Sequence, residues 1–148
     1  MKKAIFLLLF VLLLWANSKA DTKYVLVQSE LNVRSRPSLG GEIHGRLFTG
    51  DCVEVEKTYH EWSFLKNLPS EEACGWVSSN YLVNSPVTEM NCQAIVSANG
   101  RVALRKSVNG DRKSWANPGD ILTVYGKSDV WSVTNKGYIK TEFLSFAP

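Results

Sequence analysis

The chain has little of the chemistry that enzymes use. Its 148 residues include only two histidines and three cysteines. His44 and His60 fall in predicted loops, and Cys52, Cys74 and Cys92 lack the C-x-x-C spacing of a zinc site. Glycine-rich phosphate-binding loops are absent as well. No metal or other cofactor is therefore expected, and one catalytic alternative remains, in which Cys52 or Cys74 acts as a nucleophile beside a histidine.

Long apolar runs and sustained helical periodicity are missing beyond the first twenty residues. The one apolar run, Ala4 to Ala16, has 13 residues, fewer than the roughly 20 that cross a bilayer as a helix. Two lysines precede it, and Ser18-Lys19-Ala20 supplies the small residues of a cleavage site. We expect residues 1–20 to be a cleaved signal peptide that leaves no membrane span. An uncleaved membrane anchor is the alternative.

The excess of positive charge lies in this leader. The chain has 17 Lys and Arg against 14 Asp and Glu, but Lys2, Lys3 and Lys19 belong to the predicted signal peptide. The mature chain is then formally neutral, with −3 over residues 21–85 and +3 over residues 86–148. The alkaline isoelectric point of the precursor is therefore no sign of nucleic-acid binding. We expect a periplasmic or secreted protein without a nucleic-acid partner.

The chain does contain one pattern that occurs twice. The first copy reads Leu31-Asn32-Val33-Arg34, Gly50-Asp51, Trp62-Ser63-Phe64, Gly75-Trp76-Val77 and Tyr81-Leu82. The second reads Val102-Ala103-Leu104-Arg105, Gly119-Asp120, Trp131-Ser132-Val133, Gly137-Tyr138-Ile139 and Phe143-Leu144. The step from Gly-Asp to Trp-Ser is 12 residues in both copies, and the step from the later Gly to the closing Leu is 7 in both. Matched spacing across four landmarks predicts two copies of one small fold.

Each copy is predicted to be all-β. Val53, Val55, Leu122 and Val124 alternate with polar or exposed neighbours, which places them on the buried face of a strand. Turn residues such as Gly50-Asp51 and Gly119-Asp120 separate the strands. Five or six short strands in about 60 residues favour a small, strongly bent antiparallel barrel. The predicted domains are 21–85 and 94–148, joined by a linker at 86–93.

The first copy resembles the bacterial SH3-like domain over roughly residues 24–83. The motifs that carry the resemblance are Leu31–Ser38, the Gly-Asp before a Val-x-Val strand, the single Trp strand and Gly75–Leu82. The second copy, 95–144, resembles the same family in spacing but is degenerate, because no proline follows its Val-Ala-Leu-Arg. The resemblance implies two tandem SH3-like β-barrels. It also implies an exported, non-catalytic protein that binds a cell-envelope ligand, in the first place a peptidoglycan peptide, and no residues are left over for a catalytic domain.

Six residues of the first copy form the predicted ligand groove. They are the aromatic residues Tyr59, Trp76 and Tyr81, which can pack on one side and meet a ligand on the other, and the loop residues Asn32, Arg34 and Arg36. Arg36 departs from the family pattern, in which a small residue is common. Trp62 and Trp131 are expected in the core. A basic cluster in the second copy is either a contact for an acidic partner or a solvated loop; it comprises Arg101, Arg105, Lys106, Arg112 and Lys113.

The cysteines have a structural interpretation. An oxidising compartment favours disulfides, and Cys52 with Cys74 is the preferred pair because the second copy lacks both together. A bridge of this loop length stabilises by about 3 kcal/mol in the chain-entropy model. Cys92 would stay unpaired, and the pairings 52–92 and 74–92 remain open.

The main alternative function is a protein–protein module. Such a module would be an envelope assembly factor, or an inhibitor or immunity protein for a secreted enzyme. The expected partner is thus a cell-wall peptide or an envelope or secreted protein.

Overall fold

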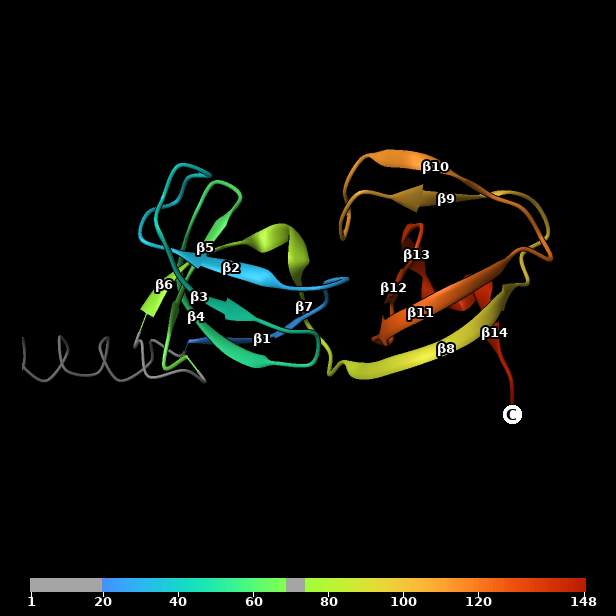
Figure 1. The fold of residues 1–148 in the computed structure, drawn as a ribbon, viewed down its shortest axis with the longest axis horizontal. Coiled ribbons are helices and arrows are strands. Elements are labelled where there is room, and N and C mark those ends of the chain that lie inside the picture. Colours follow the sequence, from blue (N-terminus) through green and yellow to red (C-terminus); the bar gives the residue numbers. More distant parts are fainter. Residues whose placement is uncertain (1–19, 69–73) are drawn as a thin grey trace, which may run out of the picture.

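The computed structural model describes residues 20–68 and 74–148. Within these residues nearly all regular structure is β-strand, as the sequence predicts, and the strands form two seven-stranded antiparallel sheets (Figure 1). The predicted signal peptide lies, apart from Ala20, outside the described residues. In the described ranges no helix is both long and apolar enough to cross a membrane.

The first sheet has the strand order β3-β2-β6-β5-β4-β1-β7. Its elements are β1 (Asp21–Val25), β2 (Leu31–Arg34), β3 (Ile43–Leu47), β4 (Cys52–Tyr59), β5 (Trp62–Lys66), β6 (Cys74–Ser78), the 3-10 turn η1 (Ser79–Tyr81) and β7 (Leu82–Val83). Val53 and Val55 are buried between exposed neighbours, because successive side chains of a strand point to opposite faces.

The second sheet repeats this topology strand for strand, in the order β10-β9-β13-β12-β11-β8-β14. Its elements are β8 (Thr88–Val96), β9 (Val102–Arg105), β10 (Arg112–Ala116), β11 (Ile121–Lys127), β12 (Trp131–Thr134), β13 (Gly137–Lys140), the 3-10 turn η2 (Thr141–Phe143) and β14 (Leu144–Phe146). The repeat in the sequence is thus a repeat in strand order. β8 begins at Thr88, inside the segment that the sequence suggests as a linker.

The repeated Gly-Asp is a turn-forming motif. Gly50 has φ +95° and Gly119 has φ +90°, a conformation that residues with a Cβ rarely adopt. One carboxylate oxygen of Asp51 accepts the Phe48 N–H at 2.8 Å, and Asp120 accepts the Asn117 N–H at the same distance. The motif therefore recurs because both copies close the same turn before equivalent strands, β4 and β11.

Each sheet encloses its own hydrophobic core. The first core is built on Val25, Val33, Val53 and Val77, and the second on Val96, Leu104, Leu122 and Ile139, all fully or almost fully buried. These residues come from equivalent strands of the two halves. Two cores of equivalent strands are what a duplicated domain is expected to have.

A third cluster joins the two halves. It contains Leu26 and Val83 from the first half and Val108, Trp131, Val133 and Tyr138 from the second. The Tyr138 hydroxyl donates a hydrogen bond to the Leu26 carbonyl at 2.8 Å, and the Val108 N–H donates to the Asn80 carbonyl at 3.1 Å. We call this contact the junction. It places the second half end-on against the first, as Figure 1 shows.

The preferred disulfide does not form. Cys52, Cys74 and Cys92, all in described segments, are free. β5 lies between β4 and β6, so that Lys66 pairs with Cys74 on one side and with Glu54 on the other. Two strand spacings separate β4 from β6 by about 10 Å, beyond the roughly 7 Å that a disulfide allows between Cα atoms. Cys92 belongs to the other sheet.

Candidate functional site

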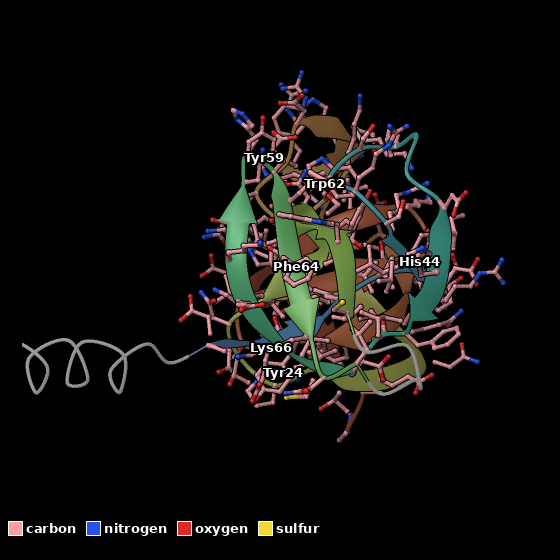
Figure 2. All side chains as sticks on the ribbon, turned by 90° about the vertical axis from the view of Figure 1, so that its left-hand side faces the viewer. Tyr24, His44, Tyr59, Trp62, Phe64 and Lys66 are labelled. Atoms are coloured by element: carbon pink, nitrogen blue, oxygen red, sulfur yellow. The ribbon has the colours of Figure 1, made fainter. Side chains whose placement is uncertain are left out.

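Four side chains form a row across the outer face of the first sheet. The cross-strand register pairs Lys57 with Phe64, Phe64 with Trp76, and Trp76 with Arg34. The rings of Phe64 and Trp76 lie 5.1 Å apart, and the Lys57 ammonium lies 4.9 Å from the Phe64 ring centre. We call this row the open face. It points away from the second half, with Phe64 near the middle of β5 in Figure 2.

A groove adjoins the open face. We call it the first groove; its volume is about 370 Å³. Asn32, Arg34 and Tyr81 of the predicted ligand set line it. The Arg34 guanidinium donates to the Leu39 and Gly41 carbonyls, at 2.9 and 3.1 Å, so that the loop holds it in place at the groove. The other residues of the lining are Val27, Gln28, Ser29, Glu30, Leu31, Leu39, Trp62, Ser78, Lys106 and Tyr138.

Asn32 brings an unused acceptor to this groove. Among the described residues its Oδ1 is the buried side-chain atom without a hydrogen-bond partner. A buried acceptor in this state costs free energy that a donor would recover. Ala103 occupies the equivalent position of the second half, which therefore lacks this amide.

The other predicted residues lie elsewhere. Trp76 is on the open face and does not line the groove. Tyr59 ends β4, with its ring 4.4 Å from that of His60 and 56% exposed. Arg36 donates to the Gly40 carbonyl at 3.1 Å, within its own loop. Three of the six residues thus line the groove, and one of these, Arg34, also belongs to the open face. Of the other three, Trp76 lies on the open face, Tyr59 at a strand end and Arg36 in a loop.

Some site residues were missed or misplaced by the sequence prediction. Trp62, expected in the core, is half-buried and lines the groove, whereas its equivalent Trp131 is buried. The alternation of β5 carries the signal, because Ser63 and Leu65 point inward and Trp62 and Phe64 must then point outward. Lys106 and Tyr138 reach the groove from the second half, which no pattern within the first copy indicates.

The equivalent row of the second half is closed. There the register joins Gly126, Val133, Tyr138 and Arg105. Val133 and Tyr138 are buried in the junction, and a Cβ on Gly126 would lie 2.6 Å from Thr49 Cγ2 and 3.0 Å from Leu26 Cδ1. Burial, and to a smaller extent Tyr81 nearby, raise the pKa of Tyr138 far above its usual range. The face that the second half uses to bind the first is therefore the face that the first half leaves open.

No cluster of three or more His, Cys, Asp or Glu side chains that could hold a metal occurs within residues 20–68 and 74–148. Cys52 and Cys74, the candidate nucleophiles of the catalytic alternative, are exposed on β4 and β6. The site offers an aromatic surface, fixed cations and hydrogen-bonding groups, which is the chemistry of recognition.

Comparison with known proteins identifies no family. No family model matches the chain, and no curated protein matches it. Among solved structures it is similar to NlpC2 from Trichomonas vaginalis, with 13% identity and a TM-score of 0.36, over 88% of this chain and 49% of that one. The chain thus spans about half the length of NlpC2. At this identity and TM-score the likeness leaves the function of the chain open.

Proposed function

We propose that the chain is an exported, non-catalytic binding protein made of two SH3-like barrels, and that its first half recognises a peptide of the cell wall. The observation that carries the proposal is the open face with its adjoining groove. The equivalent face of the second half is occupied by the junction, so this kind of surface is suited to contact with another chain. The open face remains available for a ligand.

The residues suggest how a peptide would be held. The Phe64 and Trp76 rings would pack against aliphatic side chains. Lys57 and Arg34, at the two ends of the row, would pair with carboxylates. Asn32 and Ser78 in the first groove would hydrogen-bond to the peptide backbone. Short wall peptides, which carry aliphatic side chains between carboxylates, match this combination.

Sedimentation with purified sacculi tests the proposal. The wild type should sediment with them, and Trp76→Ala combined with Tyr81→Phe should remain in the supernatant. The Tyr81 change introduces the residue that the second half has at the equivalent position, Phe143, and so respects the fold. Trp115→Ala is the matched control, since Trp115 is a 40% exposed Trp of the second half. A wild type that stays soluble, or a double variant that sediments unchanged, would contradict the proposal.

A protein partner is the second candidate. Large apolar side chains border the open face: Leu39 is 79% exposed, Tyr59 56%, and Ile43, paired with Arg34, 49%. Exposed aromatic and aliphatic residues of this kind are typical of protein interfaces. A photo-cross-linker at residue 43 that captures a stoichiometric protein, together with no sedimentation on sacculi, would favour this function over wall binding.

A further inference from the structure

The second half has a groove at the position of the first groove. We call it the second groove; its volume is about 310 Å³. Its walls are Arg101, Val102, Ala103, Arg105, Trp131, Lys140, Glu142 and Phe143. β9 supplies Val102 to Arg105 as β2 supplies Leu31 to Arg34, and Trp131 pairs with Lys140 as Trp62 pairs with Ser78. The two grooves are therefore the same structural feature, built twice.

The charge of the groove has changed between the copies. Arg101 stands where the first half has Glu30, and Lys140 stands where it has Ser78. The arginine that ends β2 is retained as Arg105. One acidic residue, Glu142, is added. The second groove thus has three cationic side chains against one carboxylate.

Neighbouring aromatic rings and a backbone carbonyl hold these three cations in place before any ligand binds. The Arg101 guanidinium lies 4.2 Å from the Trp115 ring centre, the Arg105 guanidinium donates to the Gly110 carbonyl at 2.9 Å, and the Lys140 ammonium lies 5.7 Å from the Trp131 ring centre. In the described part of the chain the one ion pair is Arg46 with Glu30, in the first half. No carboxylate therefore forms an ion pair with the cations of the second groove, and little side-chain ordering is needed when an anion binds.

We propose that the second groove binds an acidic peptide segment, with two carboxylates held by the three cations. Ala103 and Phe143, both partly exposed, give the groove an apolar strip beside its cations. This strip suits an aliphatic side chain between two acidic residues better than it suits a bare phosphate chain. The site is separate from the open face, and the proposal does not rest on the function proposed for the first half.

Titration of the purified, ¹⁵N-labelled protein tests the inference. The probe is the pentapeptide Leu-Asp-Leu-Asp-Leu, acetylated and amidated so that its two Asp side chains carry its only carboxylates. The same peptide with Asn in place of Asp is its neutral control. The amide signals of residues 101–105 and 140–143 should shift with the Asp peptide. Its affinity should be at least about tenfold higher than that of the Asn peptide and should fall with added salt.

Variants locate the binding groups. Lys140→Ser and Arg101→Glu introduce the residues that the first half has at the equivalent positions, Ser78 and Glu30. Each should lower the affinity for the Asp peptide by about tenfold. Lys136→Ser and Lys136→Glu make the same charge changes at an exposed turn outside the groove and should leave the affinity unchanged. Glu142→Gln should strengthen binding by about two- to threefold, which keeps the proposal testable if a cation variant folds poorly.

Four results would overturn the inference. The first three are equal binding of the Asp and Asn peptides, equal weakening of binding by the Lys136 variants, and shifts that map to the first groove. The fourth is that the Asp peptide shifts no signals while inorganic polyphosphate shifts those of residues 101–105, which would make the groove a phosphate site. Trp76→Ala with Tyr81→Phe should leave Asp-peptide binding unchanged, so failure at the first groove is distinguishable from failure at the second.

Discussion

A buried hydroxyl group helps to hold the two halves of the protein together. Tyr138 donates its proton to the Leu26 carbonyl, 112 residues away in the sequence. Its equivalent in the first half, Trp76, lies on the open face and has no such bond among the described residues. The same position of the repeat thus holds the two halves together in the second copy and is available to bind a ligand in the first.

Tyr138→Phe is expected to destabilise the protein by about 1–2 kcal/mol, because the buried Leu26 carbonyl loses its donor. Urea unfolding followed by fluorescence measures the change. Tyr59→Phe removes a hydroxyl from an exposed ring and should have little effect. Equal stability of Tyr138→Phe and wild type would show that the hydroxyl is unimportant to the junction.

The same tyrosine predicts a dependence on alkaline pH. Its pKa is raised in the folded state, whereas in the unfolded chain the phenol ionises near pH 10. The stability that the neutral phenol contributes is fully present below about pH 10 and is lost as the pH rises above it, because only the unfolded chain then releases the proton. The difference in unfolding free energy between wild type and Tyr138→Phe should therefore be constant from about pH 6 to about pH 9 and narrow above about pH 10. A difference that widens there would contradict the assignment.

Gly126 leaves no room for a side chain at the junction. A side chain there would meet Thr49 and Leu26 of the first half. Gly126→Val should cost about 1–3 kcal/mol through overpacking and separate the halves, with a larger radius of gyration in small-angle scattering. Gly100→Ala is the control, because no atom lies within 4 Å of the added Cβ. An unchanged scattering profile and melting temperature for Gly126→Val would contradict the junction.

At the scale of elements, the turn before each long strand is the most regular feature of the repeat. Asp51→Ala should lower the free energy of unfolding by about 1 kcal/mol, since it removes the acceptor of the Phe48 N–H. Asp120→Ala should have a similar effect in the second half. Asp129→Ala, at an exposed aspartate, is the control. Thermal unfolding of the three variants measures the effect, and a cost equal to that of the control would show that the turn does not need the carboxylate.

The position of β5 between the strands of Cys52 and Cys74 predicts that both cysteines are free thiols. Because β5 separates β4 from β6, Cys52→Ser combined with Cys74→Ser should leave stability within about 0.5 kcal/mol of the wild type. The unmodified protein should have three titratable thiols, with Cys52 and Cys74 reacting before the less exposed Cys92. A mass two daltons below that of the reduced chain, with a loss of stability on reduction, would instead show an internal disulfide.

The strand content and the repeat could be predicted from the sequence because local patterns carry them. Alternation buries Val53 and Val55, and the Gly-Asp turns recur at fixed spacing. The Cys52–Cys74 disulfide was predicted wrongly, since the distance between these cysteines depends on which strand lies between β4 and β6. The groove was predicted in part: Asn32, Arg34 and Tyr81 line it, but Lys106 comes from the other copy. Contacts between copies leave no trace in the spacing within either one.

At the scale of the whole molecule, the two halves are similar in topology and different in their surfaces. The second half retains Arg105 and Trp131 but replaces Lys57 and Phe64 by Gly126 and Val133, the smaller residues that fit against the first half. Loss of bulk on this face explains how one copy can pack against the other. The second copy is thus degenerate in motif for a structural reason.

The junction also fixes the distance and orientation between the two grooves. A molecule that carried both a wall-type peptide and an acidic segment at a matching span would bind its second group in an intramolecular step. Such coupling raises overall avidity by about a hundredfold or more without any new contact. The protein would then prefer ligands whose two binding groups are separated by the distance between the two grooves. Loosening the junction would abolish this preference and leave the affinity of each separate groove unchanged.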